Sequence, residues 1–134
     1  MDMESNRIDK EGINGALKII SSVPIITAAY WRLLQDQPII QPHLELSHGA
    51  NYLYMLTGEK PSPENVKTLE IYLNTVIEHG MNASTFAARV VMSTRSDFVS
   101  AVTAAIGAMK GVLHGGAPGP VLDMLLDMQE SGDI

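Results

Sequence analysis

The stretch of the chain that decides the fold reads Glu78-His79-Gly80-Met81-Asn82-Ala83-Ser84-Thr85-Phe86-Ala87-Ala88-Arg89-Val90. Gly80 can turn the chain, and Asn82 can accept hydrogen bonds from the first N–H groups of a new helix. We therefore expect one helix to end at His79 and the next to run from about residue 82 to residue 94. The negative end of a helix dipole favours a protonated imidazole at His79; alternatively, His79 only satisfies the last carbonyls of its own helix.

A glycine-rich loop, Leu113-His114-Gly115-Gly116-Ala117, follows a helix that we expect from the cap at Asp97 to about Gly111. Glycine permits positive φ and close backbone approach, so the loop is predicted to be tight and to present His114 to a ligand. An exposed histidine in an ordinary interhelix connection is the alternative. The preceding helix fits either a buried core helix or a subunit interface, because it carries the small residues Ala101, Ala104, Ala105, Gly107 and Ala108.

Helical patterns dominate the rest of the chain as well. Asp9 can cap a helix that begins near Lys10 and reaches Leu34, with a kink or a break into two helices at Pro24. Residues 37–42 contain two prolines and are expected to be extended. Because no segment alternates between polar and apolar residues, the predicted fold class is all-α. The remaining helices are expected over residues 50–56 with a stop at Gly58, from the cap at Ser62 to His79, and over residues 121–128.

Composition narrows the possible functions. The chain has 134 residues, a net charge of −6, 5% aromatic residues and no cysteine. The acidic balance argues against nucleic-acid binding, and the missing cysteines exclude thiolate metal sites and a cysteine nucleophile. Apolar stretches broken by charged residues or proline predict no membrane span, and the polar N-terminus resembles no signal peptide. We expect a soluble, cytoplasmic protein of one domain's length without a membrane or nucleic-acid partner.

The histidines do not form a metal signature. His43 and His48 are five residues apart, which suits neither one helix face nor a zinc motif, and a structural or surface role is expected for both. A zinc site at His79 and His114 is a minor alternative, because no carboxylate follows either residue at ligand spacing. No metal site is therefore predicted.

The two histidine motifs, together with the segments 96–97, 101–111 and 50–56, resemble the citrate synthase family. The bacterial and archaeal citrate and 2-methylcitrate synthases are the most similar branch. The resemblance implies an all-α, multi-helical protein that condenses acetyl-CoA with oxaloacetate to citrate and CoA. It also implies that the chain is an internal fragment of a longer enzyme. Residues 1–115 then correspond to the middle of the large helical domain, and residues 116–134 to the incomplete first helix of the small domain.

The resemblance assigns roles to individual residues. His114 and His79 are implied to be catalytic, with His114 donating a hydrogen bond to the thioester carbonyl as the enol forms. His79, Asn82 and Gly115 are implied to bind substrate: His79 contacts oxaloacetate, and Asn82 supports the geometry of His79. Acetyl-CoA is a substrate, and no tightly bound cofactor is implied. A homodimer through the small-residue helices 82–94 and 97–110 is expected.

The chain also departs from the family pattern. The family more often has Asp-His-Glu where this chain has Glu78-His79-Gly80. The family's proton-abstracting Asp, a further histidine and its carboxylate-binding arginines find no match after His114. The chain alone is therefore expected to be catalytically incomplete. The alternative is a catalytically inactive helical interaction module derived from the same scaffold.

Overall fold

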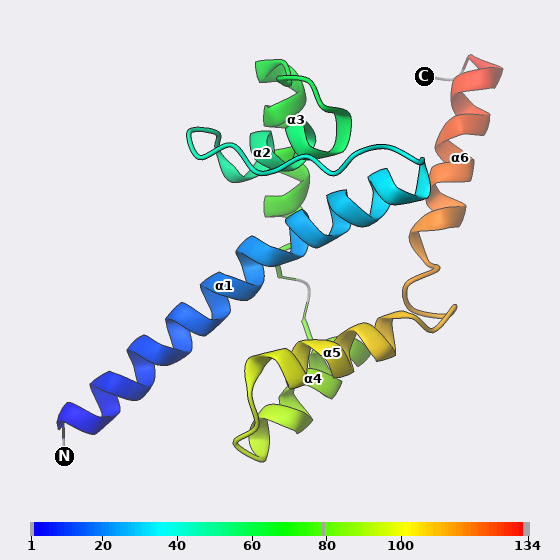
Figure 1. Ribbon diagram of the computed structural model, residues 1–134. Helices are drawn as coiled ribbons and strands as arrows, with labels where there is room; N and C mark the ends of the chain where they lie inside the picture. Colours follow the sequence, from blue (N-terminus) through cyan, green and yellow to red (C-terminus); the bar gives the residue numbers. More distant parts are fainter. Residues whose placement is uncertain (1, 79, 133–134) are drawn as a thin grey trace. The chain divides into compact units, whose positions relative to one another are not determined.

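The computed structural model describes residues 2–78 and 80–132 (Figure 1), with side chains from residue 12 onward. All regular structure in these ranges is helical, which confirms the all-α prediction. The chain divides into two compact units, Met1–His79 and Gly80–Ile134, and each is described by itself. The assignment of residues 1–115 and 116–134 to the family's two domains stays a prediction. The helices are α1 Asp2–Leu34, α2 His48–Thr57, α3 Pro63–Val76, α4 Ala83–Ser93, α5 Phe98–Met109 and α6 Pro118–Ser131.

Helix α1 is a single helix from Asp2 to Leu34. The prediction that Asp9 caps a helix beginning near Lys10 is wrong, because the segment before it contains neither Gly nor Pro to stop the helix. The predicted break into two helices at Pro24 is also wrong: proline removes one backbone hydrogen bond, and the helix continues through it (Figure 1). Helical bonding on both sides of Pro24 outweighs the loss of that one bond.

The apolar character of α1 was underestimated from the sequence. Within the described residues, Gly12–Leu34 is long and apolar enough to cross a membrane: it has 23 residues and contains an 18-residue stretch with a mean hydropathy of 1.3. The expectation that every apolar stretch falls short of a span is wrong for this helix. An apolar helix that packs inside a larger protein meets the same criterion. Length and composition therefore assign no membrane contact to α1.

A buried arginine ties the segment after α1 to α2. Arg32 is 7% exposed, and its Nε donates to the Pro38 carbonyl at 2.5 Å. Its Nη1 donates to the carbonyl of Leu56, in the last turn of α2, at 3.0 Å. Residues 37–43 form no helix, as their prolines predict, and α2 ends at Thr57 with Gly58 as its C-cap, at a left-handed φ of 86°. Arg32 thus links the C-terminal end of α2 to the segment that connects α1 with α2.

The start of α2 is fixed by side chains from two helices. The N-cap Ser47 accepts a hydrogen bond from the Ala50 N–H, so α2 begins at His48, slightly earlier than expected. The Ser47 hydroxyl also donates to Glu70 Oε1 on α3 at 3.2 Å. The carboxylate of Glu70 therefore lies at the positive end of the α2 dipole, where a negative charge stabilises the helix.

Helix α3 begins as predicted and ends early. Ser62 caps it by accepting from the Asn65 N–H, and Pro63 occupies the first helical position. The helix ends at Val76 with Ile77 as its C-cap, so the prediction of an end at His79 is wrong. Three consecutive β-branched residues from Thr75 to Ile77 disfavour a longer helix. His79 itself lies outside the described residues.

Helices α4 and α5 pack against each other in the second unit. Gly80 has a φ of 84°, and Asn82 and Asp97 cap α4 and α5, as the sequence predicts. Ala101 is buried at 2% exposure, yet Val99 and Ile106 on the same helix are 64% and 59% exposed. Within this unit α5 is therefore a half-exposed helix and not the buried core helix that one interpretation predicts.

Helix α6 is longer than its apolar pattern suggests. It runs from Pro118 to Ser131 and stops at Gly132, whose φ is 80°. Pro118 and Pro120 fit the first turn, where a missing N–H costs no helical bond. Its side chains are exposed all along the helix, including Asp123 and Asp127, which the sequence places on the solvated side.

The cap of α5 gives a pH-dependent prediction. Hydrogen bonds from the Ser100 N–H and then from the Ser100 hydroxyl lower the pKa of Asp97 in the folded state. A lowered folded pKa means that the cap stabilises the unit above the unfolded pKa of about 3.9 and loses this effect as pH falls through the folded value.

The variant Asp97→Asn is expected to show a smaller loss of stability between pH 7 and pH 3 than the wild type, because Asn caps without titrating. Urea unfolding at the two pH values measures this difference. Equal losses in the two proteins would show that Asp97 makes no pH-dependent contribution.

Candidate functional site

The loop before α6 is a series of tight turns that carries His114. The N–H groups of His114 and Gly115 both donate to the Gly111 carbonyl, at 2.9 and 3.0 Å, and the Ala117 N–H donates to the His114 carbonyl at 3.3 Å. The predicted tight loop is confirmed. Its backbone bonds fix the position from which the imidazole projects.

The glycines of this loop act through close approach and not through positive φ. Positive φ is one of the two reasons for glycine that the sequence offers here, and neither Gly115 nor Gly116 has a positive φ. A Cβ on Gly115 would collide with the carbonyl oxygen of Met109, and one on Gly116 would lie 2.6 Å from the Val112 carbonyl oxygen. Backbone oxygens cannot move aside cheaply, so both positions require the absence of a side chain.

His114 is linked to the start of α4 by a chain of hydrogen bonds. Its Nε2 lies 2.9 Å from Ser84 Oγ, and the Ser84 hydroxyl donates to Asn82 Oδ1 at 2.7 Å. Ser84 is 5% exposed and His114 is half-buried. Asn82 Oδ1 also accepts from the Thr85 N–H at 2.9 Å, which is the capping bond of α4. The N-cap of α4 thus holds, through Ser84, the imidazole of the loop that follows α5.

The structure brings some of the predicted site residues together. His114 and Asn82 are joined through Ser84, and Gly115 belongs to the backbone turn that carries the imidazole. The predicted support of His79 by Asn82 stays a prediction, because His79 lies outside the described residues. Ser84 was missed in the sequence. Its signal was a hydroxyl two residues after an N-cap asparagine, where the side chain can reach the same acceptor.

Other polar clusters in the described ranges do not compete with this site. Residues 12–78 and 80–132, whose side chains the structure describes, contain no group of three or more His, Asp or Glu residues that could hold a metal ion. His43 has the structural role expected for it: its N–H donates to Asn51 Oδ1, its carbonyl accepts from Asn51 Nδ2, and its ring meets Tyr54 edge-on at 6.2 Å.

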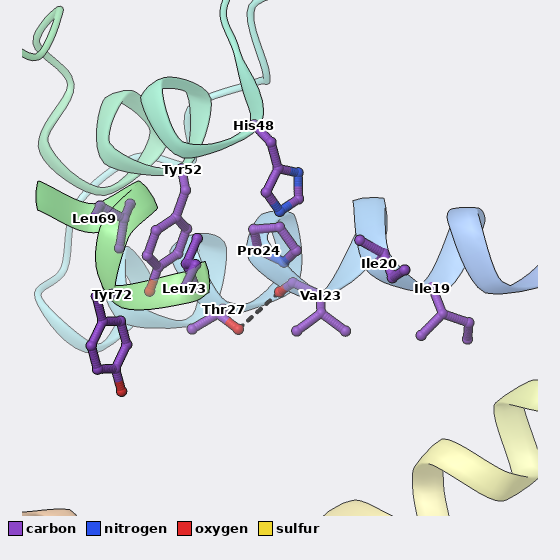
Figure 2. Close-up of a pocket in the computed structure, with 10 residues that line it drawn as sticks. All are labelled: Ile19, Ile20, Val23, Pro24, Thr27, His48, Tyr52, Leu69, Tyr72 and Leu73. Carbon is purple, nitrogen blue, oxygen red and sulfur yellow. Dashed lines mark hydrogen bonds between the residues drawn. The ribbon is translucent and has the colours of Figure 1, made fainter. Parts of the chain in front are cut away.

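A cavity in the first unit is apolar. It has a volume of about 480 Å³ and lies among α1, α2 and α3 (Figure 2). Figure 2 shows His48 on one wall and the rings of Tyr52 and Tyr72 on another, while the Thr27 hydroxyl is bonded to the Val23 carbonyl. The lining of this cavity is mostly apolar, so the cavity lacks the cluster of hydrogen-bond donors that acyl chemistry needs.

Comparison with known proteins places this geometry in a family. The family model described as citrate synthase, C-terminal domain, matches residues 2–134. A citrate synthase of Haloferax volcanii is 44% identical over 124 residues, which is 92% of this chain and 33% of that protein. A 2-methylcitrate synthase of Mycobacterium tuberculosis is 48% identical over 118 residues, 88% of this chain and 29% of that protein. The chain thus spans about a third of the length of these relatives.

Solved structures agree with the sequence relatives. Citrate synthase from Pyrobaculum aerophilum superimposes with a TM-score of 0.74 at 42% identity, over 78% of this chain and 26% of that one. A ternary complex of carboxymethyl coenzyme A and oxaloacetate with citrate synthase from Thermoplasma acidophilum gives a TM-score of 0.70 at 34% identity, over 74% of this chain and 26% of that one. With the family model spanning both the Asn82 cap and the His114 loop, this chain belongs to the citrate synthase family.

Proposed function

We propose that this chain supplies the histidine-bearing part of the active site of a citrate-synthase-type enzyme. Such an enzyme is an acyltransferase that condenses acetyl-CoA with oxaloacetate to give citrate and CoA. The observation that carries the proposal is the His114 imidazole, held by buried Ser84 in a loop that requires glycine. Both citrate and 2-methylcitrate synthases are among the relatives, so propionyl-CoA is a second acyl donor to assay.

In this proposal His114 donates a hydrogen bond to the thioester carbonyl through Nδ1, the nitrogen that does not face Ser84. Negative charge develops on that carbonyl oxygen as the acyl methyl group loses its proton. A donor that is already in place when this charge forms lowers the barrier, because no reorganisation is needed in the transition state. The hydrogen bond to Ser84 and the turn at Gly115 hold the imidazole in place beforehand.

The other residues have supporting roles in the proposal. His79 contacts oxaloacetate, Asn82 orients the histidines, and the backbone of Gly115 contacts the substrate beside His114. The proton-abstracting carboxylate and the arginines for the substrate's carboxylates come from other parts of the enzyme. No tightly bound cofactor takes part.

We also propose that the active enzyme is a homodimer in which α4 and α5 form part of the interface. Apolar side chains on this helix pair are exposed within the unit, at 60% for Phe86, 64% for Val99 and 59% for Ile106. Burial of such side chains is the main driving force of stable association.

A chimera tests the activity. This chain replaces the matching third of the Haloferax volcanii citrate synthase, and release of free CoA thiol is measured with acetyl-CoA and oxaloacetate. The chimera is expected to turn over, and His114→Ala in it is expected to lower kcat by about 10²–10³-fold, as the loss of one donor to a developing oxyanion does. His48→Gln, at the exposed start of α2, is the matched control and is expected to leave kcat unchanged.

Two results would contradict the proposal. The first is turnover by the isolated 134-residue chain, since the proposed site requires groups from elsewhere in the enzyme. The second is a chimera that folds and dimerises but has no activity, with or without His114→Ala. That second result would instead support the inactive helical interaction module, which the exposed apolar side chains of α4 and α5 also fit.

A further inference from the structure

Helix α3 is held in its unit mainly by α2. It packs against α2, whereas Leu69, Tyr72 and Leu73 face the apolar cavity that lies between α3 and α1 (Figure 2). Within Pro63–Val76, all of which the structure describes, no residue is buried. A helix that buries so little apolar surface gains little free energy from packing. The orientation of α3 therefore depends on the specific contacts that it makes with α2.

Glu70 makes two such contacts at the start of α2. Its Oε1 accepts a hydrogen bond from the Ser47 hydroxyl, with the two oxygens 3.2 Å apart. Its stem lies against the buried Gly49, because a Cβ built on Gly49 would be only 3.1 Å from Glu70 Cγ and 3.5 Å from Oε1. The side chain is thus held at its end by Ser47, and its stem occupies the space that a larger residue at position 49 would need.

The chain runs from α3 directly into the first histidine motif. Helix α3 ends at Val76, and His79 follows three residues later in the same unit. A rotation or a shift of α3 therefore changes the point from which the chain enters this motif. We propose that Glu70 is a positioning residue for the binding of oxaloacetate, because its contacts with Ser47 and Gly49 fix α3 against α2. This inference rests on the proposed function, in which His79 contacts oxaloacetate.

The chimera with the Haloferax volcanii enzyme gives the kinetic test. Glu70→Ala should raise the KM for oxaloacetate about 3–10-fold, which is the range that the loss of one hydrogen bond produces. The kcat and the KM for acetyl-CoA should stay within about twofold, because a contact that serves the ground state and the transition state equally changes binding alone.

Two further variants accompany Glu70→Ala in the chimera. Glu70→Gln keeps an oxygen that can accept from Ser47, so its KM for oxaloacetate should stay within about twofold of that of the parent chimera. Glu64→Ala removes an exposed carboxylate from the first turn of the same helix. It is the matched control and is expected to leave both KM values and kcat unchanged.

Gly49→Ala tests the close contact without any substrate. In the full 134-residue chain, the new methyl group would press on Glu70 Cγ, and the bond to Ser47 keeps Glu70 from moving aside. Gly49→Ala should therefore lower the urea midpoint of the wild-type chain. In a Glu70→Ala background the space is open, and the better helix propensity of alanine should raise the midpoint instead. Circular dichroism follows both unfolding transitions.

Three results would overturn the inference. The first is the same KM for oxaloacetate in Glu70→Ala as in Glu64→Ala. The second is a rise in both KM values together with a lower kcat, which would indicate a general structural role. The third is a Gly49→Ala substitution that shifts the urea midpoint in the same direction in both backgrounds, because Glu70 would then not be held in place. An inactive chimera would instead contradict the proposed function, and the urea midpoints would still decide whether Glu70 is held.

Discussion

Replacement of Arg32 by Ala is expected to lower the free energy of unfolding of the unit Met1–His79 by about 2–4 kcal/mol. The guanidinium is 7% exposed and donates to the carbonyls of Pro38 and Leu56. Its removal leaves two carbonyls without their donor and opens a space beside the chain. The Leu56 carbonyl also belongs to the last turn of α2, where a positive charge complements the helix dipole.

Two further variants separate these contributions. Arg32→Lys keeps the charge, but one ammonium group cannot span both carbonyls, so an intermediate loss is expected. Lys67→Ala removes an exposed cation from α3 and is expected to change the stability by less than about 0.5 kcal/mol. Urea unfolding followed by circular dichroism measures all three. A loss in Arg32→Ala no larger than that in Lys67→Ala would show that the two carbonyl contacts contribute nothing.

The parts of the fold that depend on near neighbours in sequence could be predicted. The caps at Ser62, Asn82 and Asp97 each bond to an N–H three residues ahead, so the residue type and its place before an apolar run were sufficient. The stop at Gly58 is equally local, because glycine alone adopts a φ of 86° without strain. Two of these caps, Asn82 and Asp97, also lie in the motifs that carry the family resemblance.

Features that depend on distant partners could not be predicted. The contacts of Arg32 with Leu56 and of His114 with Ser84 span 24 and 30 residues, and no local pattern indicates either pair. The sequence predicts His114 as a site residue because it stands in a glycine loop, but it does not reveal which side chain orients the ring. The end of α3 was misjudged because His79 and Gly80 gave a stronger signal than the β-branched run before them.

The glycines of the His114 loop show the same limit. Sequence alone suggested positive φ or close approach as the reason for Gly115, and only the structure selects close approach. The distinction matters for substitution. A residue with positive φ can sometimes be replaced by Asn, whereas a position against a backbone oxygen accepts no side chain at all.

Gly115→Ala is accordingly expected to destabilise the unit Gly80–Ile134 by about 1–3 kcal/mol, the usual cost of forcing extra atoms into a filled space. The new Cβ would collide with the Met109 carbonyl oxygen at the end of α5. The loop must shift to relieve this contact, and the shift carries His114 away from Ser84. The ¹⁵N NMR signal of His114 Nε2 should then move toward that of a histidine without this hydrogen bond.

Gly119→Ala is the matched control, because a Cβ at this position in the first turn of α6 meets nothing within 4 Å. Alanine has the better helix propensity, so this variant is expected to be neutral or more stable by up to about 1 kcal/mol. Urea unfolding and the His114 nitrogen signals are compared in both variants. If Gly115→Ala matched Gly119→Ala in stability and kept the wild-type His114 signals, the glycine would not be required for close approach. The loop would then hold the imidazole through its backbone turns and the Ser84 bond alone.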